Sequence, residues 1–193
     1  MPASVPAFAV VQAATGQAEH TDGDAYTGPV AALQRQFIWS GDNGVVVAAN
    51  TPDVFLHGGA GDDALAAKAG SNVLDGGAGS NFLVGGMGAD GADTFFVDGR
   101  GGQTWSTLVN FHRGDALTLW GFQPGTSSSA WTDGDGAAGY TGATLHSELA
   151  GAGTGVNASA TFAGLTLDDV HNKLTITGGA VGGLSYLNVA YTG

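Results

Sequence analysis

The sequence predicts an all-β protein in which short strands, separated by glycine-rich turns, are stacked and then closed by a β cap. Three observations lead to this prediction. Glycine accounts for 35 of the 193 residues without a collagen-type triplet, so turns must dominate the architecture. Large aliphatic residues recur every nine positions through the middle of the chain. The last third of the chain alternates in the manner of β-strands.

Three regions follow one another along the chain. Residues 1–40 are expected to form a leader that ends on a docked strand at Phe37-Ile38-Trp39. Residues 41–98 hold the repeats, and residues 99–193 hold strand-like segments that predict a C-terminal β cap domain. The only helical turn expected is Leu167–Lys173, in which two aspartates fall in the first turn.

Charge and residue content exclude several classes of protein. The 17 acidic residues and five Lys plus Arg give a formal net charge of −12, so no nucleic-acid partner is expected. Without Cys, neither a disulfide nor a thiolate zinc site is expected. No run approaches 18 apolar residues and the start lacks a basic segment, so neither a membrane span nor a Sec signal is expected. Divalent cations are the natural counter-charge for this chain.

The nine-residue repeat is the most informative feature of the sequence. One phase of the period holds Val47, Leu56, Leu65, Leu74 and Leu83 without a slip. The units are Gly58–Ala66, Ala67–Asp75, Gly76–Val84 and a fourth, Gly85–Asp90, that is followed by an insertion before Asp93. They match the pattern G-G-x-G-x-D-x-U-x, in which U is a large aliphatic residue.

Each position of the unit has a physical reason. Glycine at the first, second and fourth positions can adopt positive φ and lets backbone carbonyls converge without a Cβ in the way. These carbonyls, and the Asp or Asn oxygen at the sixth position, are hard ligands of the kind that Ca²⁺ accepts. The aliphatic residue at the eighth position points inward from a short strand, so that stacked turns bury a ladder that no unit could bury alone.

With these units, residues 51–98 resemble the RTX family, also called haemolysin-type calcium-binding repeats. The segments that follow, at residues 92–98, 108–111 and 114–119, are similar to the cap of serralysin-type and other type I secreted proteins. The resemblance implies a right-handed parallel β-roll of nonapeptide repeats with a C-terminal β-sandwich-like cap. Two units would make one turn of the roll.

The resemblance also implies where calcium would bind. One site would lie between the 58–63 and 76–81 loops, and another between the 67–72 and 85–90 loops. Each site would hold one Asp and one Asn in place of two Asp, which lowers the ligand charge, and the 67–72 loop begins Ala-Lys in place of Gly-Gly. The expected metal-binding residues are Gly59, Gly61, Asp63, Gly70, Asn72, Gly77, Gly79, Asn81, Gly86, Gly88, Asp90 and Asp93.

The function implied by the resemblance is that of a calcium-binding module of a secreted bacterial protein. Such a module would pass through a type I secretion machinery and fold with Ca²⁺ outside the cell. No H-E-x-x-H motif is present, so peptidase activity is not expected. The nearest titratable groups, His146-Ser147-Glu148 and Asp168–His171, are better explained as surface residues, and the chain is not expected to be an enzyme.

Two alternatives remain open at this point. A calcium-free β-helix would be held by ladders of Asn side chains, such as Asn72 and Asn81. A carbohydrate- or partner-binding β domain would use Trp105, Trp120 and Trp131 as an aromatic platform, although burial statistics favour the core of the cap for these rings.

Overall fold

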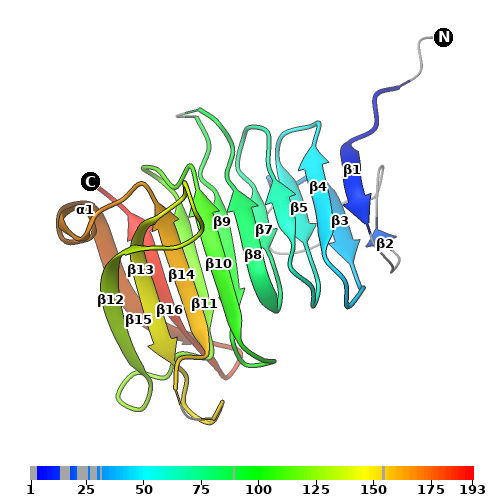
Figure 1. The fold of residues 1–193 in the computed structure, drawn as a ribbon. Coiled ribbons are helices and arrows are strands. Elements are labelled where there is room, and N and C mark those ends of the chain that lie inside the picture. Colours follow the sequence, from blue (N-terminus) through cyan, green and yellow to red (C-terminus); the bar gives the residue numbers. More distant parts are fainter. Residues whose placement is uncertain are drawn as a thin grey trace.

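A computed structural model describes residues 4–13, 18–20, 26, 30, 32–88, 90–153 and 155–193 of the chain. Within these residues the chain coils into two eight-stranded β-sheets that face each other (Figure 1). Sheet A contains, in spatial order, β1 (Phe8–Ala13), β4 (Val45–Ala49), β6 (Ala64–Ala66), β8 (Gly79–Val84), β10 (Thr104–Val109), β14 (Ala158–Ala163), β13 (Gly142–Glu148) and β12 (Ser128–Asp135). Sheet B contains β15 (Leu174–Val181), β16 (Leu184–Tyr191), β11 (Ala116–Trp120), β9 (Thr94–Asp98), β7 (Val73–Asp75), β5 (Val54–His57), β3 (Arg35–Trp39) and β2 (Ala18–His20).

The central strands of both sheets are parallel because the chain alternates between the sheets as it coils. In sheet A, Leu65 of β6 pairs with Leu83 of β8, and in sheet B, Leu56 of β5 pairs with Leu74 of β7. The partners are 18 residues apart, which is two nine-residue units for each turn. The result is a β-solenoid of about four turns, as the predicted parallel β-roll requires. Strands β10, β11 and β14 continue the parallel pairing beyond the repeats.

Antiparallel strands close both ends of the coil. At the N-terminal end, β1 pairs with β4 and β2 pairs with β3. At the other end, β13 and β12 extend sheet A, and β16 and β15 extend sheet B. Figure 1 shows β1 and β2 at one end of the stack and β12 and β15 at the other. These added strands cover parallel edges that would otherwise present unpaired backbone groups.

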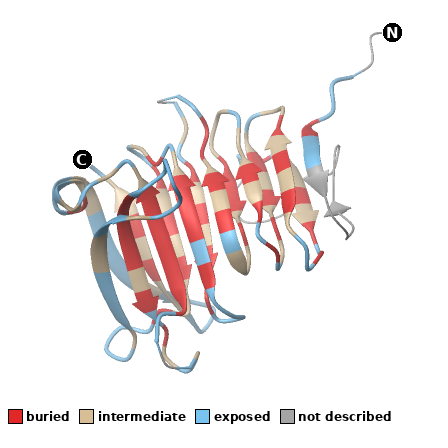
Figure 2. Ribbon diagram, viewed as in Figure 1, coloured by how far each residue is buried: buried red, intermediate tan, exposed pale blue. Residues whose placement is uncertain are grey.

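The hydrophobic core lies between the two sheets, where Figure 2 shows buried and partly exposed residues alternating along the central strands. The ladder predicted from the nine-residue phase is buried as expected. Its members with essentially no exposed surface are Val47, Leu56, Leu65, Leu74 and Leu83. Each buried leucine contributes about 1.5–3 kcal/mol of transfer free energy, and only the stacking of neighbouring turns makes that burial possible.

The predicted helical turn is confirmed as α1 (Leu167–Lys173). Its N-terminus is a capping box, in which the Thr166 hydroxyl accepts the backbone N–H of Asp169 and the Asp169 carboxylate accepts that of Thr166. The Asp169 carboxylate also contacts the Lys173 ammonium at 2.7 Å. Such reciprocal bonds satisfy N–H groups that a helix start leaves without partners. Among the described residues no helix is long and apolar enough to cross a membrane.

Candidate functional site

The glycine-rich turns form two stacks, each built from turns one coil apart. In the first stack the backbone N–H of Ala78 donates to the carbonyl oxygen of Gly59 at 2.9 Å. In the second, the N–H of Met87 donates to the carbonyl oxygen of Lys68 at 3.2 Å. Gly77 requires glycine because its φ is +71° and a Cβ there would overlap the carbonyl oxygen of Gly59. The stacking therefore brings the carbonyls of successive turns close together.

The glycines expected to bind metal lie in these turns, except Gly79, which is the first residue of β8. Those of the first stack are Gly59, Gly61, Gly77 and Gly79. Those of the second stack are Gly70, Gly86 and Gly88. A Cβ on Gly79 would overlap the carbonyl oxygen of Gly61, whereas Gly88 is exposed and has open space beside it. Close packing therefore requires glycine at Gly77 and Gly79 of the first stack, whereas it does not require glycine at position 88.

The Asp and Asn side chains at the sixth position of the units bind the backbone one turn earlier. In the first stack, Oδ1 of Asp63 accepts the N–H of Val45 at 2.8 Å, and Oδ1 of Asn81 accepts the N–H of Asp63 at 3.1 Å. In the second stack, Oδ1 of Asn72 accepts the N–H of Val54 at 3.1 Å. All three of these polar side chains are buried. They join the turns of the roll at the base of each loop.

Asp93, and not Asp90, takes the sixth position of the fourth unit. Oδ1 of Asp93 accepts the backbone N–H of Asn72 at 2.9 Å and its side-chain amide at 2.8 Å. Asp90, which is the sixth residue by counting, is exposed on the loop. Asp115 extends the ladder by one more turn, because its Oδ1 accepts the N–H of Asp93 at 2.7 Å. Asp115 was not predicted from the sequence. The Gly-Asp pair that it forms with Gly114, after the repeats, could have indicated a further turn of the ladder.

Residues 57–92 match the family model of the RTX calcium-binding nonapeptide repeat (4 copies). These residues are RTX calcium-binding repeats. The RTX repeats bind calcium as a family, so Ca²⁺ is the ion that their loops are suited to hold. Comparisons of the chain with curated proteins and with solved structures gave no match.

In two of the RTX loops a side-chain amide points at the loop carbonyls. Nδ2 of Asn81 donates to the carbonyl oxygens of Gly77 and Ala78 at 3.3 and 3.4 Å. Nδ2 of Asn72 donates in the same way to two carbonyl oxygens of its own loop, at 3.2 and 3.3 Å. An amide N–H and a cation both satisfy carbonyl oxygens. In these loops the protein itself supplies the positive partner.

The RTX loop at residues 58–63 differs because Asp63 has a carboxylate oxygen where Asn81 has its amide nitrogen. The register of β6 and β8, which starts at Ala64 opposite Phe82, makes Asp63 the counterpart of Asn81 one turn earlier. By the same spacing, Gly59 and Ala60 correspond to Gly77 and Ala78, whose carbonyls Asn81 binds. Oδ2 of Asp63 has no hydrogen-bond donor, and the residue is only 2% exposed. A buried carboxylate oxygen without a partner is costly.

The electrostatics of Asp63 agree with this geometry. Burial raises the pKa of the Asp63 carboxyl to about 6, against the opposing effects of the Val45 N–H and the nearby His57. A hard cation would remove the cost of burying the charged form, since carboxylate and carbonyl oxygens are the ligands that Ca²⁺ takes. The residues of the 58–63 loop therefore fit calcium.

The second stack satisfies its carboxylate with protein donors. Oδ2 of Asp93 accepts the backbone N–H of Gly86 at 2.6 Å, and its Oδ1 is already engaged by Asn72. Lys68, which replaces a glycine of the RTX pattern, donates its ammonium to the carbonyl oxygen of Asn50 at 3.1 Å. Within the described part of the chain, Oδ2 of Asp63 is the one buried carboxylate oxygen without a partner.

The fifth position of the units contributes contacts that sequence reasoning missed. Oδ1 of Asp53 accepts the N–H of Ser71 at 2.9 Å, and Oδ1 of Asp62 accepts the N–H of Ser80 at 2.7 Å. The pattern that could have predicted these contacts is an Asp followed by a Ser 18 residues later, which is one turn of the coil. Over the described residues, no three His, Asp or Glu side chains gather as a metal-binding cluster. A site made of loop carbonyls and one carboxylate does not need such a cluster.

Proposed function

We propose that the chain is a calcium-binding module whose RTX roll holds Ca²⁺ in the 58–63 loop. The observation that carries the proposal is the buried Oδ2 of Asp63, which has no donor. Asp63 and the carbonyls of Gly59 and Ala60 would hold the ion, and the ion would supply the positive partner that Oδ2 of Asp63 lacks. The side chain already binds the Val45 N–H through Oδ1, so a bound ion would be tied to two successive turns.

We further propose one high-occupancy site in place of two. The first site expected from the sequence pairs Asp63 with Asn81, and here the amide of Asn81 faces its own loop carbonyls. The second pairs Asn72 with the fourth unit, and there Asp93 is satisfied by Asn72 and Gly86. Calcium at the second site would have to displace these donors from the Asp93 carboxylate, whereas Oδ2 of Asp63 has no donor to displace.

The low charge of the proposed site supports a role outside the cell. Calcium sites of extracellular modules bind with dissociation constants of about 10⁻⁴–10⁻³ M, and a single carboxylate suits that range. At a Kd of about 10⁻⁴ M and millimolar Ca²⁺, binding to the folded state alone contributes about 1.4 kcal/mol of stability. We propose that the module is secreted, with type I export, that it completes folding on meeting extracellular calcium, and that it has no catalytic activity.

Calorimetry of Asp63→Asn tests the site. In the wild-type chain, Ca²⁺ should raise the melting temperature and EGTA should reverse the rise. The Asp63→Asn variant should lose this response and be more stable than wild type without calcium, by about 1–3 kcal/mol, because its amide can donate to the loop carbonyls. Asp90→Asn is the matched control, since Asp90 is exposed, and its calcium response should equal that of the wild type.

Two results would contradict the assignment. Loss of the calcium response in Asp90→Asn but not in Asp63→Asn would place the ion in the 85–90 loop. A wild-type melting curve that is identical in Ca²⁺ and EGTA would favour the calcium-free β-helix held by Asn72 and Asn81.

A further inference from the structure

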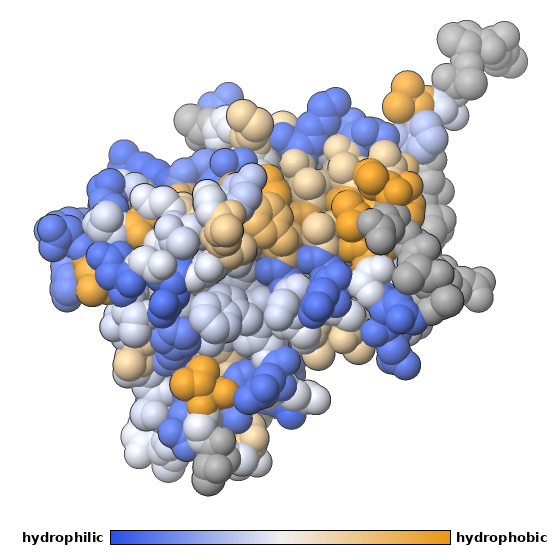
Figure 3. Space-filling view, in the orientation of Figure 1, coloured by the Kyte–Doolittle hydropathy of each residue, from blue (hydrophilic) through white to orange (hydrophobic). Residues whose placement is uncertain are grey.

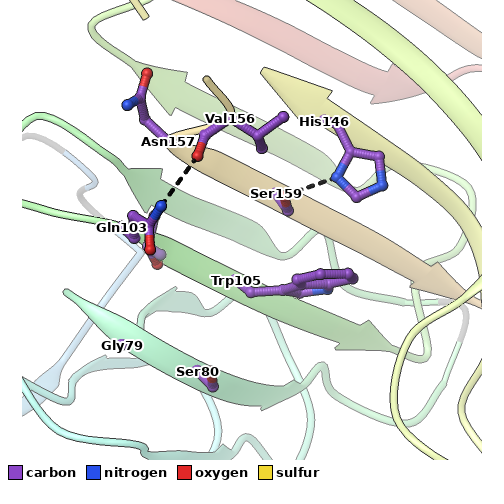
Figure 4. Close-up of a pocket in the computed structure, with 9 residues that line it drawn as sticks. Gly79, Ser80, Gln103, Trp105, His146, Val156, Asn157 and Ser159 are labelled. Carbon is purple, nitrogen blue, oxygen red and sulfur yellow. Dashed lines mark hydrogen bonds between the residues drawn. The ribbon is translucent and has the colours of Figure 1, made fainter. Parts of the chain in front are cut away.

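The outer face of sheet A carries a hollow that the calcium roll does not explain. Its volume is about 590 Å³, and it lies over β8, β10, β14 and β13. Figure 3 shows that apolar side chains gather on this face over β1 and β4, whereas more polar side chains cover the part nearer the C-terminal strands. Figure 4 shows Trp105 along one side of the hollow, with Gln103, Val156 and His146 around it.

Trp105 is an exposed aromatic ring that is held in place. Its indole N–H donates to the hydroxyl of Thr161 at 2.9 Å, and His146 packs edge-on against it with ring centroids 5.3 Å apart. The residue nevertheless remains 37% exposed. The indole N–H is therefore satisfied within the protein, and the exposed part of the ring is apolar and can contact a ligand.

The three tryptophans of the cap do not form a joint platform. Trp120 lies on the outer face of sheet B, against Phe96 and Tyr186. Trp131 packs against the buried Phe162 and the core. Trp105 alone lines the hollow in sheet A. The sequence placed the three rings together in the expected cap region, but the structure separates them between sheet A, sheet B and the core.

His146 is fixed by hydrogen bonds at both ring nitrogens. Nδ1 contacts the hydroxyl of Ser159 at 2.9 Å and Nε2 contacts the carboxylate of Asp135 at 3.1 Å. A Ser-His-Asp set suggests acyl transfer, but Ser159 is only 3% exposed and sits within a strand paired on both sides. Catalysis also requires donors aimed at a developing oxyanion, and the N–H groups of such a strand are engaged in the sheets. We treat His146 as part of a rigid polar wall.

The polar groups of the hollow are neutral amides, hydroxyls and one imidazole. Ser80 and Gln103 are exposed at its rim, and Ser159 lies at its floor. Among the described residues that line it, none is Asp, Glu, Lys or Arg. A phosphate or a carboxylate would find no fixed cation here, and the chain carries a net charge of −12. The wall therefore suits an uncharged ligand that is rich in donors and acceptors.

A second hollow of about 340 Å³ adjoins the first at Trp105. It shares Ser80 and Trp105 with the first, and Phe82 lines it under the β12–β13 hairpin. Tyr140 of that hairpin packs edge-on against Phe82, with ring centroids 4.6 Å apart. Two hollows that meet at one indole favour an extended ligand with repeating units over a single compact molecule.

We propose that this face of sheet A binds a neutral oligosaccharide, with a sugar ring stacked on Trp105 and further units in the adjoining hollows. Sugar rings have an apolar C–H face and a rim of hydroxyls, which matches an indole face surrounded by Ser80 and Gln103. A peptide would need free backbone groups to pair with, but β8, β10 and β14 are already paired on both sides. The proposal is independent of calcium binding by the roll.

Isothermal titration of the full chain with cellohexaose, maltohexaose and chitohexaose tests the proposal. At least one of these neutral sugars should bind, and Trp105→Ala should weaken that binding at least tenfold. Trp105→Phe keeps an aromatic face and should bind more tightly than Trp105→Ala. Gln103→Ala, at the exposed rim, should weaken binding without changing the circular dichroism spectrum. Trp120→Ala is the matched control, because that ring lies on sheet B, and it should bind as the wild type does.

Three outcomes would overturn the proposal. Failure of all three sugars to bind at millimolar concentration would leave the hollow to another ligand class, such as an aromatic peptide. Equal losses of binding in Trp105→Ala and Trp120→Ala, with unchanged circular dichroism spectra in both, would show that the hollow at Trp105 is not the sugar site. Hydrolysis of a bound sugar, abolished in Ser159→Ala, would make the site catalytic instead.

Discussion

The proposed calcium loop at residues 58–63 differs from the loop at residues 76–81 by one side-chain atom at the sixth position. Asp63 and Asn81 have the same backbone position and the same bond from Oδ1 to the preceding turn. Their second atom is an oxygen in Asp63 and an N–H donor in Asn81. Because the loop carbonyls have the same polarity in both places, the amide is satisfied within the protein and the carboxylate is not.

The same residue predicts an unusual pH dependence of stability without calcium. The pKa of Asp63 is raised by burial to about 6, whereas an unfolded Asp titrates near 4. Between these values the folded state binds the proton more tightly, so the free energy of unfolding should rise as pH falls from about 7 to about 4. The full effect of this group is about 3 kcal/mol.

Urea denaturation in EGTA at pH 7, 6 and 5 measures this effect. Asp63→Asn should reduce the rise in stability at low pH but not abolish it, because burial also raises the pKa of Asp115 to about 6, and Asp90→Asn should retain the full rise. With Ca²⁺ present the trend should weaken, since the proton and the ion compete for one carboxylate. Stability that falls steadily from pH 7 to pH 5 in EGTA would mean that Asp63 is charged and satisfied in the folded state.

At the scale of the elements, the turns restrict which residues the roll can accept more than the strands do. Strands β6 and β7 have only three residues each, so their register depends on the turns that join them. Gly77 combines a positive φ with direct contact to the carbonyl of Gly59. The glycine spacing of the repeat is therefore a requirement of turn stacking as well as of metal binding.

Gly77→Ala should destabilise the protein with or without calcium. The left-handed backbone alone costs about 1–3 kcal/mol for a residue with a Cβ, and overlap with the Gly59 carbonyl adds to that cost. Gly101→Ala is the control, because Gly101 has no positive φ and open space beside it, and it should melt near the wild-type temperature. Thermal melts in EGTA and in Ca²⁺ measure both variants, and a loss seen only in Ca²⁺ would mean that Gly77 matters only for the ion.

At the scale of the whole molecule, one core runs through the three regions distinguished in the sequence. Phe37 comes from residues 1–40, Leu65 from the repeats and Phe162 from residues 99–193, and all three belong to one buried cluster. The two sheets also continue without a break from the repeats into β10, β11 and β14. The parts therefore support one another as neighbouring turns of a solenoid do.

Calorimetric unfolding should accordingly show one transition. Leu65→Ala in the repeats and Phe162→Ala in the C-terminal region should each lower the temperature of that single transition, by an amount that reflects about 2–5 kcal/mol of lost packing. Two separate peaks, of which each variant moves only one, would show that residues 41–98 and 99–193 fold as independent domains.

The sequence by itself determined the features that depend on neighbouring residues. The nine-residue period predicted the buried ladder from Val47 to Leu83, and the resemblance to RTX repeats implied two units in each turn. The two aspartates in the first turn likewise predicted α1, and the structure adds the capping box at Thr166. Turn chemistry, strand alternation and helix capping are local, so a regular pattern carries enough information to place them.

Only the tertiary structure decided which side chains meet across the turns. Asn72 meets Asp93 and not Asp90, because pairing between β7 and β9 absorbs the insertion and moves the sixth position by three residues. His146 meets Ser159 and Asp135 rather than its sequence neighbours, because adjacent residues of a strand point to opposite faces. Register between distant strands is set by the packing of the whole coil, and no local spacing encodes it.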